Sequence, residues 1–338
     1  MGTNLSRGIW VIFYIVALFL LILCGLALFY RPEWNIKARY GLSILWTIVG
    51  LVALFYPSLV RLFPKLWKPQ GIKVWLLRLV LVAMFGGFFL WWSTITPMSD
   101  VSWKPEYTQN LYGDIQPKGI VLLHNMRDFH WQSAPNDGEG AVPMSALWSD
   151  AIYDINQITG MNLYLAQWSG PLIAHTLFGF DFADGRRLIF SAEARQRLGQ
   201  DYGVLPGFFK NYQMMILAAP EDDIIRLRSD FFHDRVSRYP LSLSQDAMQQ
   251  WFLTFVKAAN QLKKKPIFYN SLTVNCTTFV RSLVQDFISM PLDWRLILNG
   301  KLPKYFYDHG LMDRRKSFAE YVVQSPIVPQ DRYPQSIR

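Results

Sequence analysis

Acidic side chains are almost absent from the first 98 residues, where Glu33 is the only Asp or Glu. The same region contains three runs without any charged residue, at positions 8–30, 41–60 and 79–96. A helix needs about 20 apolar residues to cross the hydrocarbon core of a bilayer. A cleaved signal peptide would have a shorter apolar region and would not be followed by two further runs. The sequence therefore predicts a protein that crosses the membrane three times.

We expect a membrane domain at residues 1–98 and an extracytoplasmic domain at residues 99–338. The transmembrane helices are predicted at about 8–30, 41–63 and 74–96. Lys and Arg collect in cytoplasmic loops because positive side chains resist translocation. The N-terminal tail and the segment 61–78 together hold six of them, whereas the loop between the first two helices holds three. The N-terminus is therefore expected in the cytoplasm and the large domain outside.

The net charge of +9 belongs mostly to the membrane domain, which holds nine Lys or Arg and one acid. The remaining residues hold 25 bases and 24 acids and are nearly neutral. A nucleic-acid-binding protein would carry its excess charge as a basic stripe on the folded domain, so no nucleic-acid partner is expected. The sequence also lacks a phosphate-binding glycine loop and the spacing typical of a metal site. We expect neither a cofactor nor a metal.

Cysteine is scarce as well, with Cys24 in the first apolar run and Cys276 alone in the large domain. Structural cysteines of oxidising compartments usually form disulfide pairs. A lone thiol outside the cytoplasm is therefore expected to be either buried or used chemically.

Cys276 lies at the predicted start of an amphipathic helix. Apolar residues recur at helical spacing after Thr277, at Val280, Leu283, Val284, Phe287 and Ile288. Asn275 is a favoured N-cap residue, which places Cys276 in the first turn. Free backbone N–H groups there would stabilise a thiolate or a developing oxyanion. We therefore expect Cys276 to be a nucleophile, with Asn275 and Thr277 supporting the site.

A thiol nucleophile needs a base, and His175 has the most favourable setting of the five histidines. It lies in a predicted strand that leads through Ala183-Asp184-Gly185 into a returning strand. In a three-residue loop with Gly185 in the left-handed conformation, residue 182 pairs with 186 and His175 faces Glu193. A two-residue loop would turn Glu193 to the opposite face. The alternative is that His175 is an ordinary buried histidine.

The remaining pattern predicts an α+β domain. Five short apolar runs are of strand length, at Gly119–His124, Asn162–Trp168, Leu172–Phe180, Arg187–Glu193 and Gln213–Ala219. Two segments have helical periodicity, Ser145–Ile158 and Ser244–Lys263. Aromatic clusters at Phe208-Phe209, Phe231-Phe232 and Trp294 are expected mostly in the core, although they would also suit an apolar groove for acyl chains.

Six separated motifs resemble the Lnb N-terminal periplasmic domain, which occurs in bacterial lipoprotein N-acyltransferases of the Lnb type. They are Trp168-Ser-Gly-Pro-Leu-Ile-Ala-His-Thr, Asp184-Gly, Ser191-Ala-Glu-Ala-Arg, Gly207-Phe-Phe-Lys-Asn-Tyr, Arg226-Leu-Arg and Tyr269-Asn-Ser-Leu-Thr-Val-Asn-Cys-Thr-Thr, with Asn125-Met-Arg-Asp-Phe as a weaker seventh. The resemblance covers roughly residues 119–300. It implies a circularly permuted papain-like (NlpC-type) fold with an antiparallel sheet, in which the histidine precedes the cysteine. Cys276, His175 and Glu193 would be the catalytic residues.

The same resemblance implies a thiol acyltransferase in the bacterial inner (plasma) membrane with a periplasmic catalytic domain. Its partners would be the lipid bilayer, a phospholipid acyl donor and an amine acceptor, by resemblance the N-terminus of a lipoprotein. The chain departs from the family by having Arg197 and Gln200 where acidic residues are expected, and by placing its membrane spans before the domain. The alternatives are a cell-wall cysteine peptidase or amidase, and a non-catalytic membrane module.

Overall fold

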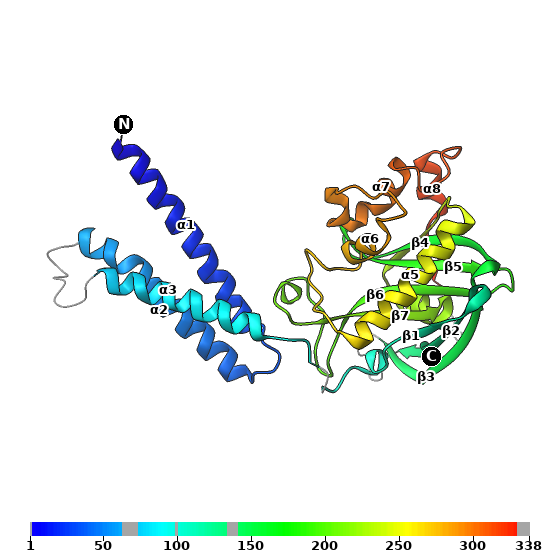
Figure 1. The fold of residues 1–338 in the computed structure, drawn as a ribbon, viewed down its shortest axis with the longest axis horizontal. Coiled ribbons are helices and arrows are strands. Elements are labelled where there is room, and N and C mark those ends of the chain that lie inside the picture. The colour runs from blue at the N-terminus through cyan, green and yellow to red at the C-terminus, as the bar shows by residue number, and fades with distance from the viewer. Residues whose placement is uncertain (1, 63–73, 99–100, 134–140, 330–338) are drawn as a thin grey trace, which may run out of the picture. The chain divides into compact units, whose positions relative to one another are not determined.

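The computed structural model describes residues 2–62, 74–98, 101–133 and 141–329. The chain forms two compact units, Met1–Thr96 and Pro97–Arg338, and each is described by itself (Figure 1). Lys65, Lys68 and Lys73, which contribute to the predicted orientation, lie outside the described residues.

The first unit contains the three predicted apolar helices, α1 (Gly2–Phe29), α2 (Ile36–Leu62) and α3 (Val74–Thr94). Each contains about 20 residues that are apolar enough to cross a membrane, at Gly8–Phe29, Ile36–Tyr56 and Trp75–Thr94. Helix α2 begins five residues earlier than expected, because the Asn35 side chain accepts a hydrogen bond from the backbone of Ala38 at 2.9 Å. Helices α1 and α2 approach closely at Gly50, where a Cβ atom would lie 2.1 Å from Leu21.

The second unit contains two antiparallel sheets, which confirms the predicted α+β class. The three-stranded sheet has the order β1-β2-β3, with β1 at Tyr112–Ile115, β2 at Ile120–Ser133 and β3 at Ala141–Asp154. The five-stranded sheet has the order β7-β6-β5-β4-β8, with β4 at Ile158–Ser169, β5 at Ile173–Phe182, β6 at Arg187–Arg195, β7 at Gln213–Pro220 and β8 at Arg235–Pro240. All five predicted strands are present.

The helix predicted at Ser145–Ile158 is wrong, because this segment forms most of β3, a short 3₁₀ turn and the start of β4. Its apolar residues fit the period of a helix as well as that of a strand, but β2 supplies a partner strand that pairs Ala146 with Phe129 and Tyr153 with Val121. Packing across the strands, including the rings of Phe129 and Trp148 at 5.3 Å, overrides the helical pattern.

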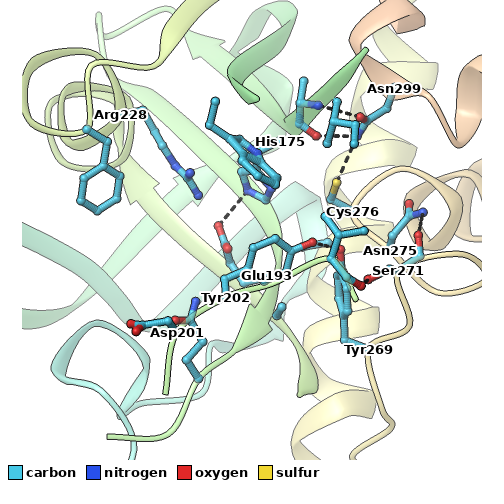
Figure 2. A pocket seen from close by; sticks show the side chains of 18 of the residues that line it. His175, Glu193, Asp201, Tyr202, Arg228, Tyr269, Ser271, Asn275, Cys276 and Asn299 are labelled. Carbon is cyan, nitrogen blue, oxygen red and sulfur yellow. Dashed lines mark hydrogen bonds and ion pairs between the residues drawn. The ribbon is translucent and has the colours of Figure 1, made fainter. Parts of the chain in front are cut away.

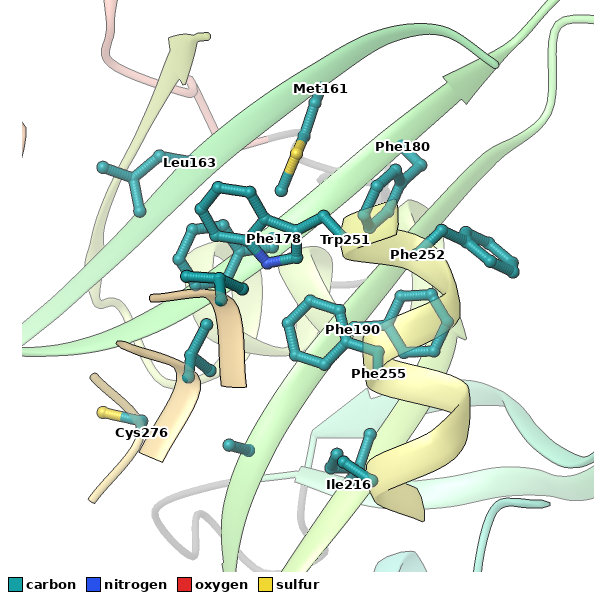
Figure 3. Close-up of a cluster of buried hydrophobic side chains, with 14 of the residues drawn as sticks. Met161, Leu163, Phe178, Phe180, Phe190, Ile216, Trp251, Phe252, Phe255 and Cys276 are labelled. Atoms are coloured by element: carbon teal, nitrogen blue, oxygen red, sulfur yellow. The ribbon is translucent and has the colours of Figure 1, made fainter. Parts of the chain in front are cut away.

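The long helix predicted at Ser244–Lys263 is confirmed as α5 (Gln245–Lys264), with the Ser244 hydroxyl as its N-cap. Its apolar stripe packs on one face of the five-stranded sheet (Figure 3). Phe190 of β6 stacks on Phe255 of α5 with ring centroids 4.9 Å apart. Burying one such side chain contributes roughly 1.5–3 kcal/mol, so this layer fixes the helix against β5 and β6. Cys276 lies at the edge of the same cluster.

The remaining helices are short. They are α4 (Glu221–Arg226), a π-helical segment at Leu227–Phe231, α6 (Thr278–Val284), α7 (Leu302–Asp308) and α8 (Phe318–Gln324). Further 3₁₀ turns include Pro105–Tyr107, Trp294–Leu296 and Asn299–Lys301. The loops between these elements, together with the ends of β5 and β6, surround the candidate site.

Candidate active site

The hairpin of β5 and β6 has the predicted register. Asp181 pairs with Arg187 and Leu177 with Ser191, and the backbone N–H of Phe182 donates to the carbonyl of Arg186. Gly185 has a φ of +86°, as the three-residue loop requires. This register is what places the side chains of residues 175 and 193 on the same face.

His175 and Glu193 form a buried ion pair in which Nε2 and Oε1 are 2.9 Å apart. The hydroxyl of Ser191 lies 2.6 Å from the same ring nitrogen and donates to Glu193. The two side chains are 11 % and 8 % exposed, so water screens the pair weakly. Because Nε2 is engaged by Glu193 and Ser191, Nδ1 is left to exchange a proton with a nucleophile.

The carboxylate determines the charge state of the histidine. Burial lowers the pKa of His175, but the charge of Glu193 together with hydrogen bonds to Cys276 and Glu193 more than offsets burial and raises the pKa to about 9. Burial raises the pKa of Glu193, but the imidazolium, the positive charge of Arg228 and the Ser191 hydroxyl together more than offset burial, so the Glu193 pKa lies well below its usual range. The pair is therefore an imidazolium and a carboxylate at neutral pH.

Cys276 is buried at 5 % exposure and lines the same pocket as His175 and Glu193 (Figure 2). Burial raises the pKa of the thiol, whereas hydrogen bonding and the positive charge of His175 lower it, and the net pKa is lowered. The structure thus brings together the three residues predicted as catalytic. The arrangement favours a thiolate beside an imidazolium, which is the reactive form of a cysteine nucleophile.

Cys276 was expected in the first turn of a helix, but α6 begins two residues later, at Thr278. Thr277 is at the N-cap position of α6 and its side chain makes no capping hydrogen bond, whereas Asn275 Oδ1 accepts from the backbone N–H groups of Thr277 and Thr278 at 2.9 Å each. Those two N–H groups are occupied by Asn275 and are not directed at the thiol. The lowered pKa of Cys276 is therefore explained by His175 rather than by a helix terminus.

The two predicted support residues hold the loop around the thiol. Asn275 Nδ2 donates to the carbonyl of Ser271 at 3.0 Å, which closes the turn before Cys276. Thr277 Oγ1 lies 3.1 Å from Thr176 Oγ1 and 3.9 Å from the Cys276 sulfur. Thr277 thereby connects the cysteine loop to β5, the strand that carries His175.

Asn299 is a site residue that the sequence did not reveal. Its buried amide donates to the carbonyl of Ala174 at 2.6 Å and lies 3.5 Å from the Cys276 sulfur. Its Oδ1 accepts from the backbone N–H of Ala174 at 2.9 Å. The next residue must be small, since a Cβ at Gly300 would lie 2.4 Å from the carbonyl oxygen of Pro171. Asn299 and Ala174 are 125 residues apart, and no local pattern predicts their contact.

The pocket has a volume of about 480 Å³ and an apolar rim. Six exposed apolar side chains contribute to its lining, namely Trp168, Phe208, Phe232, Leu272, Ile297 and Leu298. Phe208 and Phe232 were expected mainly in the core, but each is more than a third exposed. In the described part of the chain, no group of three or more His, Cys, Asp or Glu side chains could hold a metal ion.

Part of the pocket wall comes from the segment that follows the third apolar helix in the sequence. Lys104, Glu106 and Tyr107 line the pocket. The backbone N–H of Lys104 donates to the carbonyl of Gln196 at 3.1 Å, and Arg195 Nε donates to the carbonyl of Tyr107 at 2.8 Å. The segment is thereby fixed against the end of β6, the strand that carries Glu193.

Comparison with known proteins agrees with the motifs. The family model of the Lnb N-terminal periplasmic domain matches residues 145–300, which include Cys276, His175 and Glu193. The weaker motif at Asn125–Phe129 lies before the matched residues. No curated protein and no solved structure matches the chain. Residues 145–300 are thus similar to the Lnb N-terminal periplasmic domain, and this similarity together with the three apolar helices indicates a membrane protein with an extracytoplasmic domain.

Proposed function

We propose that this protein is a membrane-anchored acyltransferase that moves a fatty acyl chain from a phospholipid, through a thioester on Cys276, to an amine. The acceptor is the N-terminus of a bacterial lipoprotein, by resemblance to Lnb-type enzymes. The observation that carries the proposal is the buried set of Cys276, His175 and Glu193 in a pocket with an apolar rim. By the same resemblance, the core is a permuted papain-like fold, in which the histidine precedes the cysteine as it does in this chain.

In the first half of the reaction, the Cys276 thiolate attacks the carbonyl carbon of an ester of the lipid. A carbon–sulfur bond forms and the ester carbon–oxygen bond breaks. The imidazolium of His175 gives its proton to the departing oxygen, and the lysophospholipid leaves. Glu193 stabilises the imidazolium before this step and holds the ring in one orientation.

In the second half, the amine nitrogen of the acceptor attacks the thioester. The carbon–nitrogen bond forms, the carbon–sulfur bond breaks, and neutral His175 takes the proton lost by the nitrogen. This restores the thiolate and the imidazolium. Dividing the transfer into two steps through an enzyme-bound acyl group is ordinary covalent catalysis.

The composition of the pocket favours a lipid over a cell-wall peptide. A peptide would be bound mainly by polar groups, whereas this pocket combines charged residues such as Lys104, Asp201 and Arg228 with six exposed apolar side chains, as a lipid with a polar head and acyl chains requires. Acyl chains bury such surface at a gain of about 25 cal/mol per Å². The three apolar helices would also keep the domain at a lipid surface.

We further propose that the membrane is the bacterial inner membrane, with the N-terminus in the cytoplasm. The larger number of Lys and Arg in the N-terminal tail and the segment 61–78 supports this orientation. Cysteine labelling of intact cells with a membrane-impermeant reagent, at a residue introduced near each end of the chain, would test it.

The complete reaction can be tested with the detergent-purified protein, a phospholipid with labelled acyl chains and a diacylated lipopeptide that has a free amino terminus. We expect an N-acylated peptide from the wild type and none from Cys276→Ser. Cys24→Ser is the matched control, because it removes the other thiol of the chain, and it should keep full activity.

Cleavage of a muropeptide without any acyl transfer would show that the protein is a cell-wall peptidase and not an acyltransferase. Transfer by Cys276→Ser at the wild-type rate would exclude a thioester pathway.

A further inference from the structure

Arg228 brings a positive charge to the wall of the pocket that contains Cys276 and His175. It lies on the π-helical segment Leu227–Phe231, directly after α4. Such turns are rare and often occur at functional sites. The Arg228 side chain is 19 % exposed, and Figure 2 shows it directed from its helical turn toward His175 and Glu193.

One edge of the Arg228 guanidinium has no hydrogen-bond partner among the residues that the structure describes. Nη1 donates to Asp234 at 3.3 Å, but Nε and Nη2 donate to no described side chain or carbonyl. Arg127, which lines the same pocket, provides the contrast. Its Nε and Nη2 donate to the two carboxylate oxygens of Asp223 at 2.9 and 2.8 Å. The corresponding edge of Arg228 is open to a ligand.

Asp234 is a weak counter-charge for Arg228. Its side chain is only 5 % exposed, and burial raises its pKa although Arg228 acts in the opposite direction. The contact between them is a single long hydrogen bond. Arg228 therefore projects positive potential into the pocket, and an anion bound there would be stabilised.

We propose that the open edge of Arg228 binds the phosphate of the acyl donor, so that the donor is a glycerophospholipid rather than a neutral lipid. This rests on the proposed function. The planar Nε and Nη2 pair matches two phosphate oxygens in a way that a lysine cannot. Arg228 and Cys276 line the same pocket, so a donor bound there must have its phosphate and its ester close together. A glycerophospholipid meets this condition because both groups are attached to one glycerol unit.

The surroundings of Arg228 fit the boundary between a headgroup and its acyl chains. Its guanidinium carbon lies 5.8 Å from the ring centroid of Phe232, and that ring is 45 % exposed and belongs to the apolar rim. A charged group and an apolar surface are thus adjacent on one wall, as the phosphate and the first methylene groups are in the lipid.

The first experiment compares two donors with the same acyl chains, phosphatidylethanolamine and diacylglycerol, presented to the full-length protein in mixed micelles. The measured quantity is the rate of acylation of Cys276. We expect the wild type to react faster with the phospholipid than with diacylglycerol, and Arg228→Gln to lose about tenfold to a hundredfold with the phospholipid, as for a charge-assisted bidentate contact, so that this preference disappears. Arg235→Gln is the matched control, because Arg235 is exposed and outside the pocket lining.

An equal loss with both donors would overturn the proposal, because Arg228 would then act on the protein or on the catalytic pair instead of the phosphate. An unchanged rate with the phospholipid would overturn it as well. If the wild type accepts acyl groups from neither donor, the proposed function fails.

A second measurement tests the phosphate site without acyl transfer. The measured quantity is the rate at which iodoacetamide alkylates Cys276 in the full-length protein, and sn-glycero-3-phosphoethanolamine should lower this rate in the wild type but not in Arg228→Gln. Glycerol should protect neither protein. Equal protection by inorganic phosphate alone would indicate a site for free phosphate and would overturn the lipid assignment. Equal protection of wild type and variant would show that Arg228 does not bind the phosphate.

Discussion

Asn299 connects the two halves of the candidate catalytic pair. Its Nδ2 lies 3.5 Å from the sulfur of Cys276 and also donates to the carbonyl of Ala174, the residue before His175, at 2.6 Å. Asn299 therefore fixes the distance between the strand that carries the base and the loop that carries the thiol. It is a positioning residue, and its effect on chemistry passes through Cys276 and His175.

Replacing Asn299 with Ala should impair both stability and thiol reactivity. The backbone N–H and the carbonyl of Ala174 would both lose their hydrogen bonds to the Asn299 side chain, which would lower the free energy of unfolding by about 1–3 kcal/mol. The cysteine loop would move relative to β5, so the pH profile of Cys276 alkylation should shift to higher pH. Asn162→Ala is the control, because Asn162 is equally buried but bonded to Asp181. A shift in both variants, or in neither, would argue against a positioning role.

Replacing Glu193 with Gln should raise the pH at which Cys276 becomes reactive. The charge and hydrogen bond of Glu193 help to keep His175 positively charged, and that charge lowers the thiol pKa. Without the carboxylate, the imidazole is neutral at neutral pH and the thiolate loses its counter-ion. The alkylation rate measured against pH should therefore show a midpoint above that of the wild type. An unchanged midpoint would show that His175 does not act on the thiol.

The same ion pair should make stability depend on pH in a defined direction. The pKa of His175 is raised from 6.5 to about 9, so its contribution is complete below pH 6.5 and is lost as the pH rises through 9. The Glu193 pKa is lowered from 4.5, so its contribution is present above pH 4.5 and is lost on acidification. In a Cys276→Ser background, where no thiol titrates against His175, the stability of the protein with Glu193 relative to the protein with Glu193→Gln should therefore fall between pH 6.5 and 9, by at most about 3 kcal/mol.

Denaturant unfolding of the detergent-purified protein, followed by tryptophan fluorescence, would measure this difference. A constant difference across that pH range would mean that His175 is neutral in the folded protein.

Removing aromatic side chains from the pocket rim should reduce activity only on long acyl chains. Phe208→Ala combined with Phe232→Ala removes apolar surface that a bound chain would cover, at roughly 1.5–3 kcal/mol for each fully buried ring. We expect a loss of tenfold or more in Cys276 acylation by a long-chain phospholipid and little change with a short-chain ester. Leu198→Ala should have no effect, since Leu198 is 67 % exposed but does not line the pocket. Equal losses on both substrates would place the aromatics in structural packing.

Local sequence rules were sufficient for the parts of the site that depend on one hairpin or one helix. The loop at Ala183–Gly185 determines the register of β5 and β6, and the register determines that His175 faces Glu193. The apolar helices and α5 could likewise be predicted, because their periodicity and length are properties of continuous segments.

The features that could not be predicted depend on contacts between distant segments. Ser145–Ile158 has an apolar pattern that fits a helix, and its pairing with β2 makes it a strand. Helix α6 begins at Thr278 rather than directly after Asn275, although the Asn275 side chain accepts from the N–H groups of Thr277 and Thr278. Asn299 and Arg228 enter the pocket from loops and turns whose position is set by packing alone.

The most direct test of the central claim is the mass of the Cys276 peptide after Cys24→Ser protein has been incubated with phospholipid. The account predicts a fatty acyl group on Cys276 that hydroxylamine releases, and no such group when His175 is replaced by Asn. A Cys276 that alkylates readily with iodoacetamide but never carries an acyl group would contradict it.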